Sequence, residues 1–584
     1  MDSAAAPRYG VAAMDAAFPE LARQYVDEAP ALAPTYATWL GDHRFDGQLD
    51  HVGRAATERH AAFCRTYQER LGRIARAALS RADQVDAAIL EHHLRSERWH
   101  LEELQEWAWN PMFYTGLAGG AIYNLMARDF APLAERLNHV ADRLAEFPRL
   151  MGEVRETLDP ARVPKVHAET AVKQNPGVLG ILEGMVRPRL GEMSSRDQAR
   201  LVAAMETARA AVDAQQRWLE TDLLPHAAGE FRLGAARYDA KLAFALQSPL
   251  GRREIRARAE AELARTTEEM YEIAARCLRE QGDGSSLPAR PSHEEKLAAI
   301  RSALEIAYGQ VPPHDGIVEA ARASLAELTD FVRRADLVTL PSDPVEVIVM
   351  PEFQRGVALA YCDSPGPLDA GQRTFYAIAP LPADWTEEQV RSFLREYNVR
   401  SLHNLTVHEA MPGHYVQLAH SNRYPSKLRA ILASGPFIEG WAVYAEGLMA
   451  DHGVCGGDPL ARLVVLKWRL RGILNALLDQ AVHVDGMTRE SAMALLTGDG
   501  FQEEREAAGK WTRAQLTSAQ LATYFVGYQE HVDLCREVQA AWGAGFTARR
   551  YHDTVLSFGS PPTQYVRALM LDLPIKAAGG CCRS

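Results

Sequence analysis

Apolar residues recur three and four positions apart through more than half of this chain, and this spacing constrains its fold more than any other feature. Residues 131–158 and 253–281 show the pattern most clearly, with charged residues on the opposite face. This period is typical of amphipathic α-helices, which bury their apolar stripe against other elements. The sequence therefore predicts a mostly α-helical protein, with a helical N-terminal part over residues 12–340.

Two short runs of β-branched and aromatic residues interrupt the helical pattern, at residues 345–350 and 374–379. Pro and Gly bound both runs, as is typical of short β-strands. We predict that the two runs form a small β-sheet inserted into the helical chain, and that helices resume after Trp385.

The chain contains no low-complexity linker of the kind that separates domains. We therefore expect residues 1–584 to form a single compact unit, although the length alone would suit several domains. Within this unit, residues 341–575 carry the sheet and the predicted chemistry, and residues 576–584 are expected to form a flexible tail.

Charge and cysteine content exclude several classes of function. The formal net charge is −12 with both signs interleaved, so no basic surface is offered to nucleic acid or to an anionic membrane. The N-terminus does not resemble a signal peptide, and no segment is long and apolar enough to span a membrane. The 7 scattered cysteines fit a reducing compartment. We expect a cytoplasmic protein that binds neither nucleic acid nor membranes, and the sequence leaves open whether it forms a homodimer.

The strongest chemical signal is the pair His408-Glu409, followed by His414. Zinc peptidases of the His-Glu-x-x-His type place two histidines on one helix face and use the Glu as general base. Here the second histidine comes two residues later, where a regular helix would turn the rings about 120° apart. Pro412 cannot donate to the carbonyl of His408, and Gly413 tolerates a distorted turn. We predict a helix interrupted at Pro412-Gly413, so that the two histidines converge.

A catalytic zinc needs three protein ligands and one open position. Glu439 lies 25 residues after His414, at the start of an apolar helix where an unpaired carboxylate would be costly to bury. Glu446 falls within about 20° of the same helix face. The alternative is a solvated acidic stripe, but the intervening Trp441 and Tyr444 favour a buried helix. We predict Glu439 as the third ligand and Glu446 as the partner that orients a ligand histidine.

The segments HEAMPGHY and EGWAVYAE resemble the signature pair of the family called domain of unknown function 885. That family is grouped with the helical zinc peptidases, near carboxypeptidase Taq and angiotensin-converting enzyme in architecture. Similar motifs elsewhere extend the resemblance over about residues 30–575. It implies a large helical, metallopeptidase-like architecture with a deep cleft, and a small β-sheet inserted before the metal-binding helix.

The resemblance also implies a ligand set, with His408, His414 and Glu439 as zinc ligands and Glu409 as base. Where the family often has a second histidine after Pro-Gly-His, this chain has Tyr415, so His414 is the available second ligand. The basic helix of the family, which ends in an Asp and a His, is matched only in part, by Arg469, Arg471, Asp479 and His483.

A zinc ion in this arrangement would polarise the scissile carbonyl and lower the pKa of a water molecule. Glu409 would take the proton of this water and pass it to the leaving amine. The oxyanion formed on attack needs a further donor. Tyr524 is the first candidate, although a helical Tyr is more often a core residue. His483 is the second, with Asp479 four positions before it to orient the ring, and a plain surface pair is the alternative.

Candidate substrate contacts lie on the predicted sheet and on the partly matched basic helix. An exposed edge at residues 374–379 would pair with an extended peptide and so place its scissile bond. Tyr361 and Tyr376 would flank that cleft, unless they serve only in packing. Arg469 and Arg471 would hold a substrate carboxylate, unless they are solvated.

Taken together, these features predict a metal-dependent hydrolase with one Zn²⁺ per chain, and we favour a peptidase that acts on peptide or small amide substrates. The rival enzyme is a zinc amidase or esterase with the same metal and base, acting on a non-peptide small molecule or an N-acyl amino acid. A non-catalytic binding protein on the same fold would not need Glu409. A di-iron carboxylate protein needs two Glu-x-x-His motifs, and the chain offers only Glu97-x-x-His100.

Overall fold

Helices form most of the chain, and the predicted mostly α fold class is confirmed. The computed structural model describes residues 17–281, 288–350, 359–369, 371–382 and 385–576. The helices before the sheet are α2 (Ala17–Glu28), α3 (Pro34–Leu40), α4 (Arg54–Gly72), α5 (Arg81–Trp99), α6 (Pro111–Met126), α7 (Leu133–Ala145), α8 (Phe147–Thr157), α9 (Lys165–Gln174), α10 (Pro176–Ile181), α11 (Ser195–Trp218), α12 (Leu224–His226), α13 (Gly234–Leu246), α14 (Arg252–Glu280), α15 (His293–Tyr308) and α16 (Ile317–Ala335). The helices after it are α17 (Glu387–Glu396), α18 (Val399–Glu409), α19 (His414–Ser421), α20 (Lys427–Ile431), α21 (Gly435–Asp451), α22 (Pro459–His483), α23 (Arg489–Gly498), α24 (Glu504–Leu516), α25 (Ala522–Trp542), α26 (Ala548–Leu556) and α27 (Thr563–Met570).

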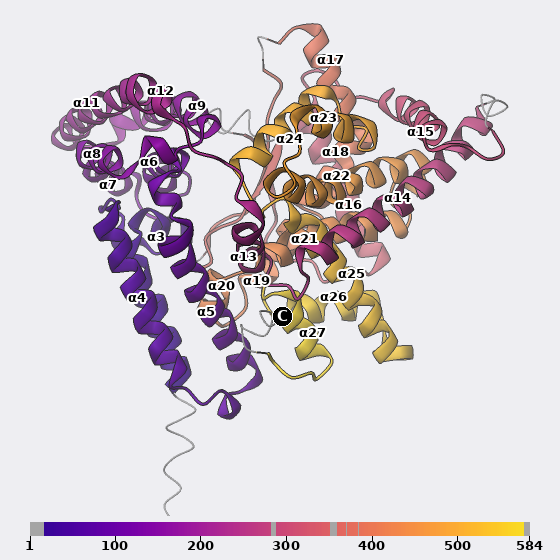
Figure 1. Ribbon diagram of the computed structural model, residues 1–584, viewed down its shortest axis with the longest axis horizontal. Helices are drawn as coiled ribbons and strands as arrows, with labels where there is room; N and C mark the ends of the chain where they lie inside the picture. Colours follow the sequence, from indigo (N-terminus) through magenta and orange to yellow (C-terminus); the bar gives the residue numbers. More distant parts are fainter. Residues whose placement is uncertain (1–16, 282–287, 351–358, 370, 383–384, 577–584) are drawn as a thin grey trace, which may run out of the picture.

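The helices gather into two groups that lie side by side (Figure 1). The first group runs from α3 to α12, coloured indigo to magenta, and the second contains the orange and yellow helices from α16 onward. Two helices lead from one group into the other, since α14 packs along α22 and α13 contacts α21, α22 and α25. The candidate site lies in the second group.

A sheet of three short strands precedes α18 in the chain. Its strands are β1 (Glu346–Val349), β2 (Ala360–Asp363) and β3 (Phe375–Ile378), in the order β1-β3-β2. The two predicted strands are therefore confirmed as β1 and β3, while β2 was not predicted. Because β3 pairs in parallel with β1 and antiparallel with β2, the segment 374–379 is the centre of the sheet. The prediction of an exposed edge there is wrong, and the strand that packs most extensively against α18 is β2.

The N-terminal turns of α21 pack against α25 at two glycines. A Cβ atom at Gly440 would lie 2.3 Å from the carbonyl carbon of Gly527, and one at Gly527 would lie 2.0 Å from the carbonyl oxygen of Pro436. The two backbones therefore meet without intervening side chains. Since Gly440 directly follows Glu439, this contact fixes the backbone that carries the third predicted ligand.

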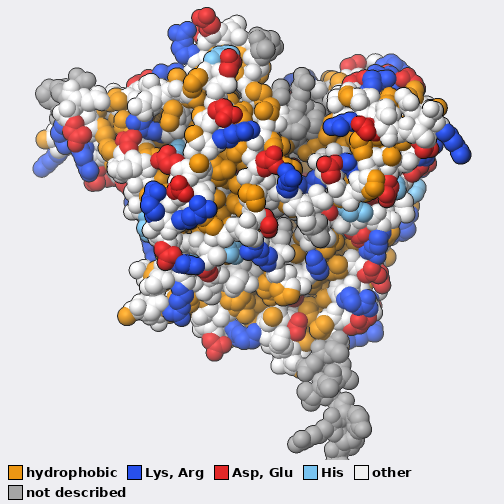
Figure 2. Space-filling view, turned by 180° about the vertical axis from the view of Figure 1, so that it is seen from behind, with side chains coloured by type: hydrophobic (Ala, Val, Ile, Leu, Met, Phe, Trp, Pro, Cys, Tyr) orange, Lys and Arg blue, Asp and Glu red, His pale blue; other side chains and the backbone are white. Residues whose placement is uncertain are grey.

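The surface carries charges of both signs, interleaved with apolar patches, as Figure 2 shows for one face. No helix among the described residues is both long and apolar enough to cross a membrane. The predicted tail over 576–584 lies, apart from Lys576, outside the described residues.

Candidate metal centre

The chain turns sharply between α18 and α19. The first helix ends at Glu409, the Met411–Pro412 peptide bond is cis, and the second helix begins at His414. The predicted interruption at Pro412-Gly413 is thus confirmed. As a result, the ring centroids of His408 and His414 lie 4.8 Å apart, although six residues separate them in the chain.

Gly413 allows the close approach of backbone that this turn requires. Its N–H donates a hydrogen bond of 2.9 Å to the carbonyl of Val407. A Cβ at position 413 would lie 1.9 Å from the carbonyl oxygen of His408 and 2.3 Å from that of Val407. Because these are backbone atoms of α18, neither can rotate out of the way.

Gly413→Ala should therefore destabilise the fold by about 1–3 kcal/mol, as overpacking of a tight site does, and should displace His414. We expect a lower Tm and weaker zinc retention after dialysis. Gly435→Ala, at the first position of α21, is the matched control because a Cβ there meets no atom within 4 Å. Wild-type stability and zinc content in Gly413→Ala would contradict this account of the turn.

His408, His414 and Glu439 converge on one point. His408 Nε2 and His414 Nε2 lie 3.7 and 3.5 Å from Glu439 Oε2. Two ligands of a tetrahedral zinc ion lie about 3.3 Å apart, whereas a charge-assisted hydrogen bond measures about 2.7–2.9 Å. The separations therefore fit shared ligation of one ion better than direct pairing. Among the described residues, this is the only group of three His, Cys, Asp or Glu side chains whose ligand atoms approach within 4.8 Å of one another.

The orientation of His408 is fixed through its other ring nitrogen. His408 Nδ1 lies 2.7 Å from Glu446 Oε1, and the second oxygen of Glu446 accepts a hydrogen bond of 2.8 Å from Asn404. A carboxylate at Nδ1 holds the proton there, so Nε2 is left with its lone pair facing Glu439. The structure thus places Glu446 where the sequence predicts it.

The electrostatics of the cluster favour a positive charge between these groups. Burial alone lowers the pKa of His408, but the carboxylates of Glu439 and Glu446 raise that pKa well above its usual value. Burial raises the pKa of Glu439, yet the two histidines outweigh burial and hold it far below the usual range. A divalent cation would supply the positive charge that these carboxylates favour. The donor set of two imidazoles and one carboxylate fits zinc with an open position.

Glu409 lies beside the cluster and is held by the sheet. The backbone N–H of Cys362, in β2, donates a hydrogen bond of 3.0 Å to Glu409 Oε2. Burial raises the pKa of Glu409, which makes this carboxylate a better proton acceptor than an exposed one. Its second oxygen is left for another partner.

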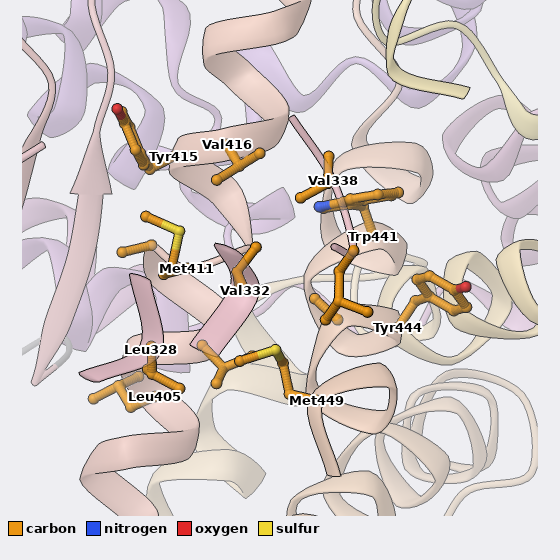
Figure 3. Packing of buried hydrophobic residues seen from close by; sticks show 14 of the residues in the cluster. Leu328, Val332, Val338, Leu405, Met411, Tyr415, Val416, Trp441, Tyr444 and Met449 are labelled. Atoms are coloured by element: carbon orange, nitrogen blue, oxygen red, sulfur yellow. The ribbon is translucent and has the colours of Figure 1, made fainter. Parts of the chain in front are cut away.

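The turn between α18 and α19 is packed inside the core. Trp441 Nε1 donates a hydrogen bond of 2.9 Å to the carbonyl of Pro412, which ties α21 to the turn. Tyr415 donates its hydroxyl hydrogen to the carbonyl of Asp343, so this position is structural. Figure 3 shows the side chains around the turn, which come from α16, α18, α19, α21 and, for Met411, the turn itself: Leu328, Val332, Leu405, Met411, Tyr415, Val416, Trp441, Tyr444 and Met449.

Of the two predicted oxyanion donors, only Tyr524 is partly exposed, since His483 is buried. Tyr524 is half-buried in α25, and Arg513 Nη2 donates to its hydroxyl over 3.3 Å. His483 Nε2 is committed elsewhere, because it donates to the carbonyls of Ala514 and Thr517 at 2.9 and 2.7 Å. The structure therefore does not bring His483 to the metal cluster.

Asp479 does not orient His483 either. The separation of His483 Nε2 and Asp479 Oδ1 is 3.9 Å, which is too long for a hydrogen bond. Asp479 instead accepts a hydrogen bond of 3.0 Å from the hydroxyl of Tyr238 in α13. Asp479 and His483 thus both contact Tyr238 of α13, at the C-terminal end of α22.

The buried position of Asp479 predicts a pH dependence of stability. Burial raises the pKa of Asp479 to about 7, whereas an unfolded Asp titrates near 3.9. Between these values the folded state binds more protons than the unfolded state, so the free energy of unfolding falls as pH rises. Asp479→Asn should remove up to about 1.4 kcal/mol per pH unit of this slope. Urea unfolding from pH 4 to pH 8 would test it, and equal slopes in both proteins would contradict the assignment.

The four predicted substrate-binding residues are mostly occupied within the protein. Tyr376 is fully buried and its hydroxyl pairs with Thr406 at 3.1 Å, so the prediction that it lines a cleft is wrong. Tyr361 is half-buried, and its pKa is raised by burial and by the neighbouring Tyr123 of α6. Of these two tyrosines, only Tyr361 has exposed surface.

The two arginines also have partners of their own. Arg469 is buried and its guanidinium lies 5.1 Å from the ring centre of Tyr528. Arg471 donates to Glu396, which also accepts from the buried Lys467 at 2.8 Å. Arg471 is thus paired within the protein and Arg469 is buried against an aromatic ring, while the role of the two residues as substrate contacts stays a prediction.

Three contributions to the site were missed by sequence reasoning. They are the amide of Asn404, the backbone N–H of Cys362 and the indole of Trp441. Asn404 could have been found, because it precedes His408 by one helical turn and shares its face. The N–H of Cys362 is a backbone group, so the residue type gives no indication of its role. The Trp441 contact depends on how α21 packs.

The fold and the site together define the class of this protein, which is mostly helical and carries a His₂Glu cluster with an adjacent carboxylate. The chain belongs to the family described as bacterial protein of unknown function (DUF885), whose sequence profile matches residues 34–570. The family resemblance drawn from its motifs is thereby confirmed. No curated protein matches the chain.

Two solved structures share the fold. The first, a candidate lipoprotein of unknown function from Shewanella oneidensis, is 32% identical with a TM-score of 0.81, over 95% of this chain and 99% of that one. The second, a candidate lipoprotein from Colwellia psychrerythraea, is 18% identical with a TM-score of 0.77, over the same shares. Lipoproteins are attached to membranes through a lipid, so these proteins contradict the cytoplasmic location that the cysteines and the N-terminus predict.

Proposed function

We propose that this chain is a zinc-dependent hydrolase and that its substrates are peptides. The observation that carries the proposal is the convergence of His408, His414 and Glu439, with Glu409 directly beside them. A binding module would need the ligands but no carboxylate next to them. The side chain of Glu439 is 27% exposed, so a substrate can reach the cluster from solvent. We further propose that the helical groups form a metallopeptidase-like architecture with the site in a deep cleft.

A zinc ion held by these ligands would act as a Lewis acid on the scissile carbonyl and make water more acidic. Glu409 is positioned to take a proton, since Cys362 N–H holds one of its oxygens and leaves the other open. The same carboxyl group would then deliver the proton to the leaving amine. Glu446 keeps Nε2 of His408 aimed at the ligand cluster. Tyr524, whose hydroxyl accepts from Arg513, is the candidate donor to the oxyanion.

The open edge of β2 supports a peptide substrate. Leu359 accepts a hydrogen bond from Ala379 N at 2.7 Å, so alternation along the strand directs the N–H and C=O groups of Ala360 and Cys362 away from β3. The N–H of Cys362 on that side already donates to Glu409, so a substrate strand would use the N–H of Ala360 and the two carbonyls. No described strand pairs with that side. An extended peptide could add there as a further strand, with its scissile bond beside Glu409.

A zinc amidase or esterase would use the same ligands and base, and it is the second candidate. It would have no use for a strand edge beside the base, which is why we favour peptides. The candidate lipoproteins of the same fold favour a protein that works outside the cytoplasm.

The test is a digest of a mixed peptide library by the zinc-loaded protein, read by mass spectrometry with and without a chelator. We expect cleavage that the chelator abolishes and that added zinc restores. Absence of cleavage, together with zinc-dependent hydrolysis of N-acyl amino acids or esters, would replace the peptidase proposal by the amidase or esterase.

A further inference from the structure

A pocket of about 510 Å³ begins where the β2–β3 ladder ends. Leu359, which precedes β2, and Ala379, which follows β3, both line it. Leu359 lies three residues before Cys362, the residue whose N–H holds Glu409. At about 3.3 Å per residue, the pocket therefore starts about 10 Å along the strand from the proposed base.

This placement determines which part of a substrate would reach the pocket. A peptide that pairs antiparallel with β2, in the pattern β2 already uses with β3, runs in the opposite direction to the strand. Its chain beyond the scissile bond then extends from the level of Cys362 towards Leu359. The residue that arrives at the pocket is about the third one on the C-terminal side of the cleaved bond.

The inner wall of the pocket is aromatic. Phe393 lies between Trp385 and Tyr397, with ring centroids 5.3 and 4.8 Å away. These three side chains come from α17 and the residues at its two ends, so they are held by one helix. Such a wall suits a long apolar stem or a ring.

The charged groups of the pocket leave a negative excess. Glu396 is neutralised by Lys467 and Arg471, and Glu506 lies 3.7 Å from Arg471. Glu503 is half-buried and, within the part of the chain that the structure describes, forms no ion pair. Among the described residues that line the pocket, Arg505 is the single cation, and it lies 5.4 Å from the ring centre of Trp385, while Glu388 adds an exposed negative charge.

We infer that this pocket is a specificity site of the proposed peptidase, one that receives a lysine or arginine side chain about three residues C-terminal to the cleaved bond. The apolar stem of such a side chain would lie along Phe393 and Tyr397, and its positive end would meet Glu503. An acidic side chain would face the carboxylates of Glu388 and Glu503, for which the described part of the chain supplies no ion pair. This inference rests on the proposed function, because it assumes a peptide on the edge of β2.

The test uses a series of peptides that share one cleavage site and differ only at the third residue beyond it, as Arg, Leu or Glu. We expect KM to be about five-fold lower for Arg than for Leu, with Glu the weakest, as for one half-buried ion pair. Calorimetry can also measure the affinity of the same peptides for zinc-loaded Glu409→Gln. This measurement involves no turnover, and the affinities should follow the same order.

Glu503→Gln should remove the preference for Arg over Leu, both in KM and in binding. Glu504→Gln is the matched control, because Glu504 is the exposed neighbour and does not line the pocket. Equal KM values across the series, a preference that survives Glu503→Gln, or a preference for Arg on the N-terminal side would overturn the inference while cleavage itself upholds the peptidase. Failure to bind or cleave any peptide would overturn the proposed function and this inference with it.

Discussion

Glu409→Gln is expected to keep about one zinc per chain while lowering kcat by a factor of about 10²–10⁴, the usual contribution of general acid–base catalysis. The amide has the size of the carboxylate and its oxygen can still accept from Cys362 N–H, so the turn should not change. What is lost is the ability to take a proton. Metal analysis of the purified variant and turnover of a cleaved peptide would measure the two effects separately.

The chain offers a control for this substitution in a second His-Glu dipeptide, His293-Glu294, which is exposed on α15. Glu294→Gln should leave both zinc content and turnover unchanged. If Glu409→Gln turned over peptide at the wild-type rate, Glu409 would not be the base. If it lost zinc as well as activity, its role would be structural.

His408→Ala and Glu439→Ala are each expected to reduce zinc from about one per chain to near zero after dialysis. Two ligands hold zinc far less tightly than three, and each change also leaves a buried partner unpaired. Glu446 would lose its bond to the His408 ring in the first variant, and both histidines would lose their shared carboxylate in the second. Elemental analysis with circular dichroism would separate metal loss from unfolding.

His293→Ala serves as the matched control, since this histidine is exposed and pairs only with Asp499 in the described structure. It should retain all its zinc. A full complement of zinc in folded His408→Ala or Glu439→Ala would disprove the ligand assignment, whatever the activity of the variant.

The sequence was most informative where local geometry decides the structure. The spacing of His408 and His414 is incompatible with a regular helix, and Pro412 with Gly413 identified where the helix breaks. The strands β1 and β3 were likewise visible as β-branched runs. By contrast, β2 has no β-branched residue and contains Asp363, so its strand character comes from pairing with β3.

Long helices limited what could be inferred about the rest of the site. The helix α22 runs from Pro459 to His483, and at about 1.5 Å per residue its ends lie more than 30 Å apart. Arg469 and His483 lie 14 residues, or about 21 Å, apart on this helix, so they could not both lie beside the candidate metal cluster. In the structure His483 stacks on Tyr238 of α13, and Arg469 contacts Tyr528 of α25. Which side chain of a buried helix faces which neighbour depends on tertiary contacts that no local pattern encodes.

The meeting of α21 and α25 at Gly440 and Gly527 has a consequence for how relatives of this protein can diverge. A side chain at either position would collide with backbone, which no rotamer can relieve. A larger residue could enter only if the two helices moved apart, and Glu439 would then withdraw from the histidines. Relatives that keep the metal should therefore keep glycine at both positions. Relatives that have lost His408 or His414 should accept larger residues there. In an alignment of relatives, larger residues at Gly440 and Gly527 would then indicate that the metal centre has been lost, although neither glycine is a ligand.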